Sequence, residues 1–542
     1  MESNITVDIN KTDVGDHMSY GITADADMAI SAGTSTGIAV GSPSVRTGDF
    51  EAVIGLEVHS QLLTKTKMFC SCPNIFGLEP NSAVCPVCLA LPGALPVINF
   101  EGVKLAVKAA LALNININKK SLFARKNYFY PDLPKGYQIS QYLDPVSSDG
   151  YLNIKTDGGG KKIRINRLHI EEDAGKLIHI GNRSYVDLNR AGTPLVEIVS
   201  EPDISSATEA AAYLKALREI LVYLGVSDGN MEEGSFRCDA NVSVRKKGDT
   251  KLGTRAEVKN VNSFKFVEKA IDYEIGRQID VILSGGNVIQ ETRLYDSKEN
   301  ATRSMRGKEE AHDYRYFEEP DLPPLILDEE FIAEIKNSIT ELPGAKRERY
   351  IKEYSLTEYD SEVLTQDKKI AYYFENLIKI NAGNKNRVEI KKITNWVIND
   401  LLFALKTIEN QRSSGTAEPA LKEGNMPEPQ AFFNLILKVE TGNINKSTGK
   451  AVLNEMLLTG KKPNDIIKEK NLAQVSDEKG LEGIIKQILD ENSKELADLI
   501  GGKDKLFGFF VGEAMKKTKG KANPKKVNEI LKNLIEEKKK VS

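Results

Sequence analysis

The residues with the most informative chemistry lie in the stretch 167–203, where two acids follow apolar strand patterns. Glu197 shares one face of a predicted strand with Leu195 and Val199. Because an isolated buried charge is costly, this carboxylate must be paired, protonated or bound to a cation. Glu172 ends a similar apolar pattern upstream, and two inward-facing carboxylates would repel each other unless a cation lay between them. The alternative is that both acids lie at strand ends and face water or nearby Arg and Lys side chains.

A carboxylate and an imidazole alternate on one face of the first predicted strand. In the segment FEAVIGLEVHSQL, Glu57 and His59 project side by side, about 7 Å apart at the usual rise of a strand. Such a pair can share a divalent metal ion, or the acid can orient the imidazole as a general base. An exposed Glu–His pair without either role is the alternative.

A third polar face is predicted for the strand 236–244, in which apolar and polar residues alternate. Asp239 and Asn241 lie on its polar face, and Lys259 extends the polar character into the next segment. Side chains of this kind can coordinate magnesium, contact a cofactor or hydrogen-bond a substrate. A solvated outer sheet face is the usual cause of such alternation and stays open as an explanation.

Four of the five cysteines form two close pairs, Cys70 with Cys72 and Cys85 with Cys88. Two close pairs across a short loop are typical of a tetrahedral four-sulfur zinc site, whereas free thiols are the alternative. The site is expected to be structural, because four thiolates leave no open position for water or substrate. Cys238 stands apart and is predicted to be a small core residue.

The segment 125–141 has the residues of a ligand-binding loop. It contains two prolines and a glycine, together with Arg125, Lys126, Lys135 and Gln138, and four tyrosines lie between Tyr128 and Tyr142. Cations next to aromatic rings in a constrained loop favour a phosphate-bearing or planar ligand. Packing of the tyrosines in the core explains the pattern comparably well.

Composition indicates an ordinary soluble protein of two to four domains. The chain has 542 residues and a formal net charge of −3, so no global charge attracts nucleic acid and any RNA contact must use a local basic patch. It has no apolar run of about 18 residues and no N-terminal secretory pattern, which places it in the cytosol without a membrane partner.

The elements that must position these residues change character along the chain. Strand patterns dominate up to about residue 325, interrupted by helices expected near 100–113, 206–224 and 264–284, and helical patterns follow. We therefore expect an α+β fold with a β-rich first domain, whose sheet is mixed or antiparallel, followed by two all-helical domains. The predicted limits are a mobile extension at 1–48, a catalytic domain with the cysteine cluster at 49–340, a helical domain at 341–425 and a C-terminal helical tail at 426–542.

Several long motifs, in this order, resemble the B subunit of the tRNA-dependent amidotransferase. The resemblance extends from about residue 50 to the C-terminus and leaves the first 48 residues aside. The motifs are IGLEVH (54–59), KNYFYPDLPKGYQISQY (126–142), RLHIEEDAGK (167–176), DLNRAGTPLVEIVSEPD (187–203), MEEGSFRCDANVSVR (231–245), DYRYFEEPDLPPL (313–325) and the C-terminal GKANPKKVNEIL.

The resemblance implies an ATP-dependent carbon–nitrogen ligase that uses glutamine as its amide donor. The family phosphorylates the side-chain carboxylate of misacylated Asp-tRNA(Asn) or Glu-tRNA(Gln), and ammonia then displaces phosphate to give Asn-tRNA or Gln-tRNA. By analogy with the family's metal site, His59, Glu172 and Glu197 are expected to bind Mg²⁺, with Glu57 and Asp239 nearby.

Nucleotide binding must use another arrangement than a P-loop, because the β-rich domain has no GxxxxGK[ST] pattern. Arg125 and Lys126 are expected to contact phosphate, and Asn241 and Lys259 complete the predicted cofactor-binding set.

The resemblance also implies partners. No room for a large inserted domain exists between the motifs, which favours a heterotrimer with an amidase (A) subunit and a small C subunit. The helical domains are expected to hold tRNA by shape and charge, and the window 516–526, which has six lysines and no acid, is the expected phosphate contact. Two competing hypotheses are a non-catalytic tRNA-binding scaffold and a zinc-dependent RNA-binding module.

Overall fold

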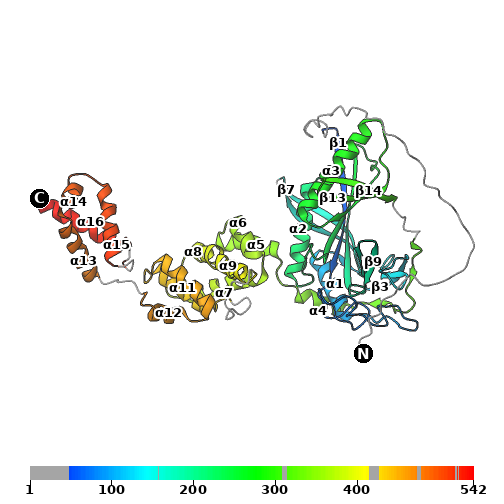
Figure 1. Ribbon diagram of the computed structural model, residues 1–542, viewed down its shortest axis with the longest axis horizontal. Helices are drawn as coiled ribbons and strands as arrows, with labels where there is room; N and C mark the ends of the chain where they lie inside the picture. Colours follow the sequence, from blue (N-terminus) through cyan, green and yellow to red (C-terminus); the bar gives the residue numbers. More distant parts are fainter. Residues whose placement is uncertain are drawn as a thin grey trace, which may run out of the picture. The chain divides into compact units, whose positions relative to one another are not determined.

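The computed structural model describes residues 48–156, 158–307, 314–413, 426–472, 478–518, 522 and 524–541. The extension predicted at 1–48 lies outside the described residues up to residue 47, and so does part of the lysine window, including Lys519 and Lys521. The described chain is rich in strands up to residue 326 and helical after it (Figure 1). The predicted α+β class is therefore confirmed.

A nine-stranded sheet forms the frame of the β-rich part, with the strand order β14-β13-β12-β11-β1-β10-β7-β6-β2. Neighbouring strands are antiparallel except β12 and β13, which are parallel, so the sheet is mixed. Its strands are β1 (Phe50–Gln61), β2 (Asn116–Ile117), β6 (Ser147–Thr156), β7 (Gly159–Glu172), β10 (Pro194–Ser200), β11 (Phe236–Lys246), β12 (Ala256–Val261), β13 (Glu291–Asp296) and β14 (Ala301–Gly307).

Three smaller sheets surround the large one. One has the order β15-β4-β5, and the other two are the pairs β16-β3 and β8-β9. Their strands are β3 (Lys120–Ser121), β4 (Ala124–Asn127), β5 (Tyr137–Ser140), β8 (Lys176–Ile180), β9 (Arg183–Asp187), β15 (Phe317–Glu318) and β16 (Leu325–Ile326).

Helices pack on the apolar face of the large sheet. They are α1 (Phe100–Ala112), α2 (Ala207–Tyr223) and α3 (Phe264–Leu283), close to the three helices predicted from the sequence. Apolar residues of β1, β7, β10 and β11 form one core with these helices, for example Leu56, Ile170 and Val196. Since side chains alternate along a strand, the intervening residues of the same strands point to the opposite face. That opposite face, called the open face below, carries Glu57, His59, Glu197, Asp239 and Asn241.

Capping fixes where two of these helices begin. The Ser206 hydroxyl accepts a hydrogen bond from the Glu209 amide at the start of α2, and the Ser263 hydroxyl accepts one from the Phe266 amide at the start of α3. The Glu209 carboxylate accepts a hydrogen bond from the Ser205 amide and not from that of Ser206, so Ser206 and Glu209 form only the first of the two bonds of a capping box.

The next helices share a second hydrophobic core, which includes Trp396, Phe432 and Val452. A π-helical turn at Trp396–Leu401 separates α8 from α9. This core contains residues on both sides of the domain boundary predicted between residues 425 and 426. The domain boundaries remain a prediction. The helix α4 (Glu329–Ser338) still packs on the first core through Ile335. The helices of the second core are α5 (Pro343–Tyr354), α6 (Glu358–Thr365), α7 (Lys368–Gly383), α8 (Ile390–Asn395), α9 (Leu402–Ser413), α10 (Pro429–Glu440), α11 (Lys446–Thr459) and α12 (Pro463–Glu469).

The last four helices have a core of their own, with Leu489, Phe510 and Leu531 among its buried residues. They are α13 (Glu478–Glu491), α14 (Ser493–Ile500), α15 (Lys505–Lys517) and α16 (Pro524–Val541). Among all the described helices, none combines the length and the apolar character that crossing a membrane requires.

Candidate active site on the open face of the large sheet

Three neighbouring strands bring an imidazole and two carboxylates together. His59 on β1 is paired in register with Glu197 on β10, and Glu197 is paired with His169 on β7. His59 Nε2 lies 3.2 Å from a Glu197 carboxylate oxygen and 3.8 Å from a Glu171 oxygen. His169 Nε2 lies 3.6 Å from both carboxylates. We call His59, Glu171 and Glu197 the carboxylate–imidazole cluster.

The structure does not place Glu172 in this cluster, which corrects the placement predicted for that residue. Glu172 follows Leu168 and Ile170 on the core face of β7, as its apolar neighbours indicated. Because residues alternate between faces, the acid that joins His59 and Glu197 must be the adjacent Glu171. Neither Glu171 nor His169 was singled out from the sequence. The pairing of Glu197 with His169 identifies them, and this register is not readable from the sequence.

Burial and charge together set the protonation of the cluster. Burial lowers the pKa of His59, but the hydrogen bond and charge of Glu197 and the charge of Glu171 raise it to about 9. Burial opposes ionisation of Glu197, yet the imidazoles of His169 and His59 and the ammonium of Lys126 hold its pKa well below the usual range. The cluster is therefore a buried pair of carboxylates that depends on nearby positive charge.

The geometry of the cluster fits a divalent cation. One ligand atom from each of His59, Glu171 and Glu197 lies within 4.8 Å of the others. In octahedral Mg²⁺ coordination, ligands at about 2.1 Å from the ion lie roughly 3 to 4.2 Å from each other, so the three side chains can reach one ion with small adjustments. Two carboxylates and an imidazole leave further positions for water or phosphate oxygens.

Two cations flank the cluster. Lys126 on β4 lies 4.9 Å from the centre of the Tyr314 ring, and its pKa is raised: burial opposes this, but the charges of Tyr316, Glu171 and Glu197 outweigh it. Arg167 on β7 lies 4.0 Å from Glu197 and donates a hydrogen bond of 3.4 Å to His169 Nδ1. Both cations can meet negatively charged ligand groups at the metal position.

Arg125, the residue next to Lys126, is held in a different environment. Its guanidinium donates two hydrogen bonds of 2.8 Å to Glu319 and one of 3.1 Å to Asp321. It also lies 4.3 Å from the Tyr137 ring centre. The structure therefore separates the two predicted phosphate contacts, because only Lys126 is directed at the carboxylate–imidazole cluster.

A second polar group lies on the same sheet face, on β1, β11 and β12. Glu57 is paired in register with Asp239 and accepts a hydrogen bond of 2.9 Å from the Asn241 amide. Lys259 donates a hydrogen bond of 2.5 Å to Asp239 and lies 3.5 Å from Glu257. The structure thus brings together the four predicted residues, with Glu57 two residues before His59 on β1 and the other three on the neighbouring strands β11 and β12.

Arg237 connects the sheet face to the loop after β7. Its guanidinium donates a hydrogen bond of 2.9 Å to Asp173, which also accepts one of 2.9 Å from the Gln61 amide. Burial opposes ionisation of Asp173, but the charges of Arg237 and Arg190 outweigh it and lower the pKa of this carboxyl. Within the described part of the chain, Arg237 Nε is buried without a hydrogen-bond partner, which leaves a donor beside the cluster.

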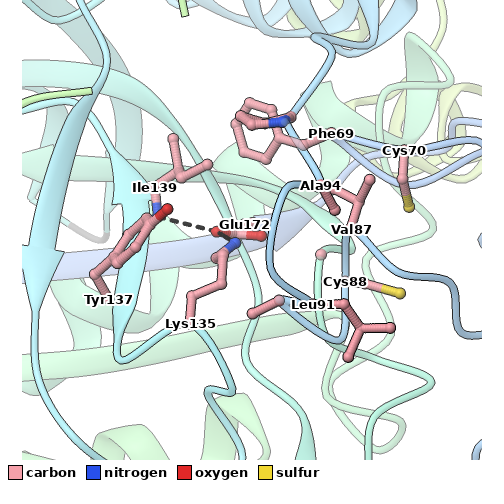
Figure 2. A pocket seen from close by; sticks show the side chains of 13 residues that line it. Phe69, Cys70, Val87, Cys88, Leu91, Ala94, Lys135, Tyr137, Ile139 and Glu172 are labelled. Atoms are coloured by element: carbon pink, nitrogen blue, oxygen red, sulfur yellow. Dashed lines mark hydrogen bonds and ion pairs between the residues drawn. The ribbon is translucent and has the colours of Figure 1, made fainter. Parts of the chain in front are cut away.

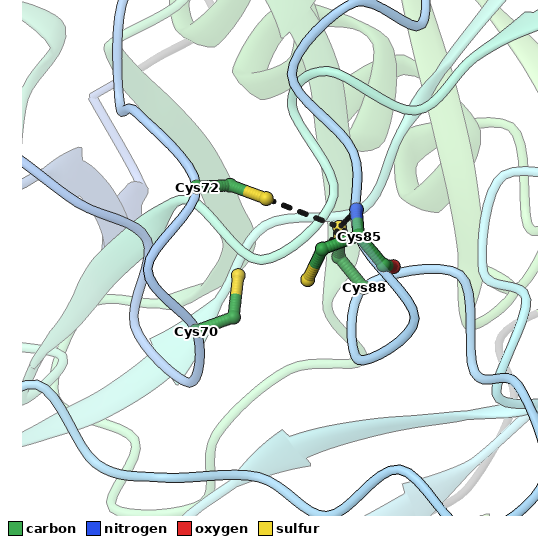
Figure 3. A group of neighbouring side chains, drawn as sticks. All are labelled: Cys70, Cys72, Cys85 and Cys88. Atoms are coloured by element: carbon green, nitrogen blue, oxygen red, sulfur yellow. Dashed lines mark hydrogen bonds between the residues drawn. The ribbon is translucent and has the colours of Figure 1, made fainter.

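The four predicted metal-binding cysteines converge in space (Figure 3). Their sulfur atoms all lie within 4.8 Å of one another, with Cys72 and Cys88 separated by 4.0 Å and Cys85 and Cys88 by 3.8 Å. Ligands of a tetrahedral zinc ion with Zn–S bonds of about 2.3 Å lie roughly 3.8 Å apart. The donor set fits zinc and leaves no position open. The fifth cysteine, Cys238, is buried in the core of the sheet.

A cavity of about 170 Å³ separates the cysteine cluster from the sheet (Figure 2). Cys70 and Cys88 line one side of it, and Lys135, Tyr137 and Glu172 line the other. Glu172 forms an ion pair with Lys135 and accepts a hydrogen bond of 3.0 Å from the Ile139 amide. Glu172 is therefore a buried, satisfied carboxylate on the core side of the sheet.

Comparison with known protein families gives one match to the β-rich part of the chain and another to its helical part. The family described as the GatB/GatE catalytic domain matches residues 52–333, and the family described as the GatB domain matches residues 373–535. Three relatives are named as the B subunit of an aspartyl/glutamyl-tRNA(Asn/Gln) amidotransferase. That of Persephonella marina is 53% identical over 90% of this chain and 100% of its own length. The B subunit of Geotalea daltonii is 54% identical over 89% of this chain and 98% of its own length. The B subunit of Thermodesulfovibrio yellowstonii is 54% identical over 90% of this chain and 100% of its own length.

Proposed function

Since this chain belongs to the family of Asp/Glu-tRNA(Asn/Gln) amidotransferase B subunits, we propose that it activates the side-chain carboxylate of a tRNA-bound amino acid and converts it to an amide. The observation that carries this assignment is the carboxylate–imidazole cluster on the open face of the large sheet. The substrates are misacylated Asp-tRNA(Asn) or Glu-tRNA(Gln), with ATP and glutamine. The reaction is that of a carbon–nitrogen ligase with glutamine as amide donor.

The chemistry requires activation because a carboxylate is a poor acyl donor. A side-chain carboxylate oxygen attacks the γ-phosphorus of ATP, the bond to the bridging oxygen breaks and ADP leaves, which gives an acyl phosphate. Ammonia released from glutamine then attacks the acyl carbon, and phosphate leaves with the electrons of the C–O bond. The ammonia loses a proton and the amide is formed.

The chain's own residues position and stabilise the charged groups of this reaction. His59, Glu171 and Glu197 would hold Mg²⁺, with Glu171 in the role predicted for Glu172. When bound, the ion neutralises charge on phosphate oxygens during phosphoryl transfer. Lys126 and Arg167 lie on the same side and would attract the transferred phosphoryl group.

The group formed by Glu57, Asp239, Asn241 and Lys259 would orient the substrates. The Lys259 ammonium on β12, two strands away from His59 on β1, provides a positive charge that would meet a phosphate or a carboxylate. The Asn241 amide can donate to a nucleotide or to the substrate. Arg125 contributes indirectly, because its bonds to Glu319 fix the strand that carries Lys126.

The cysteine cluster would bind a structural zinc ion through Cys70, Cys72, Cys85 and Cys88. Burial raises the pKa of the Cys72 thiol to about 11, whereas the pKa of Cys88 shifts in the opposite direction. The hydrogen bond from Cys70 lowers the pKa of Cys88 to about 4, against the effect of burial, and the Lys67 charge contributes. Zinc bound here would fix the loop that covers the cavity next to Glu172.

The partners follow from the family. We propose a cytoplasmic heterotrimer in which an amidase subunit releases ammonia from glutamine and a small C subunit supports the assembly. The helices from α5 to α16 would bind tRNA, through a surface that recognises shape and charge.

The test is a single-turnover experiment with the assembled complex. With [γ-³²P]ATP and Asp-tRNA or Glu-tRNA, but without glutamine or ammonia, label should move to the aminoacyl group and be chased into free phosphate when ammonia is added. If amide forms on adding ammonia while no label ever reaches the aminoacyl group, the activation chemistry is wrong. If the complex only binds tRNA, the scaffold hypothesis replaces it.

A further inference from the structure

Lys67 is a lysine that is completely buried beside the cysteine cluster. Its side chain has no exposed surface, and its ammonium donates hydrogen bonds to the carbonyl oxygens of Ala83 at 2.8 Å and Leu188 at 3.3 Å. Within the described part of the chain, it forms no ion pair with a carboxylate. A buried ammonium that is satisfied only by neutral carbonyl groups is costly, so another source of negative charge is expected nearby.

Lys67 touches both arms of the cysteine cluster. Its backbone amide donates a hydrogen bond of 3.0 Å to the carbonyl oxygen of Cys72, in the first arm. Its ammonium binds the carbonyl oxygen of Ala83, two residues before Cys85, in the second arm. The bond to Leu188 attaches both arms to the loop that leads into β10. The lysine is therefore placed to hold the whole cluster against the sheet.

Charge balance explains why a cation is buried at this place. A divalent zinc ion with four thiolates leaves an excess of negative charge that burial would make unfavourable. A cation immediately outside the ligands offsets part of it. Groups next to metal ligands commonly tune metal affinity in this way.

We propose that Lys67 is the counter-charge of the metal-loaded cysteine cluster and that it positions both cysteine arms. This inference rests on the zinc site proposed above, but not on the amide-forming activity. Removal of the charge should therefore weaken metal retention while the four ligands stay the same.

The experiment compares the full chain with its Lys67→Met variant, which keeps most of the side-chain volume but removes the ammonium. Zinc content is measured by mass spectrometry, and zinc release to a chromophoric chelator gives the affinity. We expect roughly 10- to 100-fold weaker zinc binding, in line with other groups adjacent to metal ligands. Lys65→Met is the matched control, because Lys65 is exposed two residues away, and it should bind zinc as the native chain does.

Two further measurements separate charge from packing. Lys67→Met should lower the Tm of the zinc-loaded protein more than that of the zinc-free protein, whereas a loss of packing alone would lower both equally. Lys67→Gln keeps a hydrogen-bond donor without the charge and should also weaken zinc binding, even if the methionine variant fails to fold. Native zinc affinity in Lys67→Gln, or equal changes in Tm, would overturn the proposal. A native chain without zinc would overturn both the proposal and the zinc site.

Discussion

At the level of single residues, the account depends on which of two adjacent acids faces His59. The choice between Glu171 and Glu172 is decided by the alternation of side chains on β7 and by the register of β7 with β10. Glu171 contacts the imidazoles of His59 and His169, whereas Glu172 is paired with Lys135 on the core face. The two acids therefore have different predicted functions although they are neighbours in the sequence.

Replacement of Glu171 or Glu197 by glutamine should remove a metal ligand without a large change in side-chain volume. Loss of the ion's charge stabilisation, worth several kcal/mol, predicts that amide formation falls by roughly 100-fold or more. Glutamine hydrolysis by the assembled complex should persist, because it takes place on the amidase partner. Formation of Asn-tRNA or Gln-tRNA and release of glutamate are measured in the same reaction.

The contrasting variant is Glu172→Gln, which leaves the half-buried Lys135 ammonium without its ion-pair partner. We expect a loss of about 3 to 5 kcal/mol in the free energy of unfolding of the β-rich part, larger than for Glu171→Gln. Denaturant unfolding followed by circular dichroism measures the difference. If Glu171→Gln kept full activity while Glu172→Gln was stable but inactive, Glu172 and not Glu171 would be the metal ligand.

At the level of elements, the sequence was sufficient to predict the strands that carry the candidate site, but not how these strands pair. The alternation in β1 and β11 correctly placed Leu56 and Val242 in the core. The sequence also identified the three helices of the β-rich part. It could not show that β10 lies between β1 and β7, because strand order depends on contacts between residues far apart in the chain. For that reason His169 and Glu171 were missed.

A close helix contact in the second core provides a test of packing. A Cβ atom on Gly449 in α11 would lie 2.6 Å from the Val439 side chain and 3.0 Å from the Trp396 ring. Gly449→Ala should therefore destabilise this core by about 1 to 3 kcal/mol through overpacking. Urea unfolding can be followed by the fluorescence of Trp396, which is the single tryptophan of the sequence. Gly383→Ala is the control, because no atom lies within 4 Å of its added Cβ, and it should have little effect.

The ion pairs around α5 give the second core a dependence on pH. Hydrogen bonds from Arg349 lower the pKa of Glu341 to about 2, against the effect of burial. Because this folded pKa lies below the ordinary value of 4.5, the stabilisation is present above pH 4.5 and is lost as the pH falls toward 2. Thermal unfolding between pH 5 and 3 should show a falling Tm. The Glu341→Gln variant should have a lower Tm at pH 5, and its Tm should change less with pH. If its Tm fell as steeply with pH as that of the native chain, the assignment to Glu341 would be wrong.

At the level of the whole molecule, the described chain has separate hydrophobic cores for the sheet and for each of two groups of helices. The polar face of the sheet carries the candidate active site, and exposed lysines such as Lys516 and Lys517 lie on the last helices. We therefore propose that the sheet activates the substrate and that the helical parts bind the tRNA body. The sequence predicted the change from strands to helices after about residue 325, and the structure confirms it.

Lysines of the last helices should contribute to tRNA binding through phosphate contacts. Lys516 and Lys517 end α15 in the lysine-rich window, and in the described part of the chain they form surface ion pairs with Glu513 and Glu491. Replacement of both by alanine should weaken tRNA binding and reduce the slope of log Kd against log salt by about 1 for each phosphate that is no longer neutralised. Filter binding at several salt concentrations measures the slope. The exposed pair Lys246 and Lys247 is the control. If its replacement weakened tRNA binding equally, the binding would depend on the overall positive charge of the chain and not on the last helices.

The central claim is that His59, Glu171 and Glu197 bind one divalent ion on the open face of the sheet. The most direct measurement is anomalous diffraction at the manganese edge from crystals of the full chain grown with Mn²⁺ and ATP. We predict an anomalous peak within about 2.3 Å of His59 Nε2 and of one oxygen from each of the two carboxylates. A map with no peak at this position, or with its peak at Glu172 instead, would contradict the account.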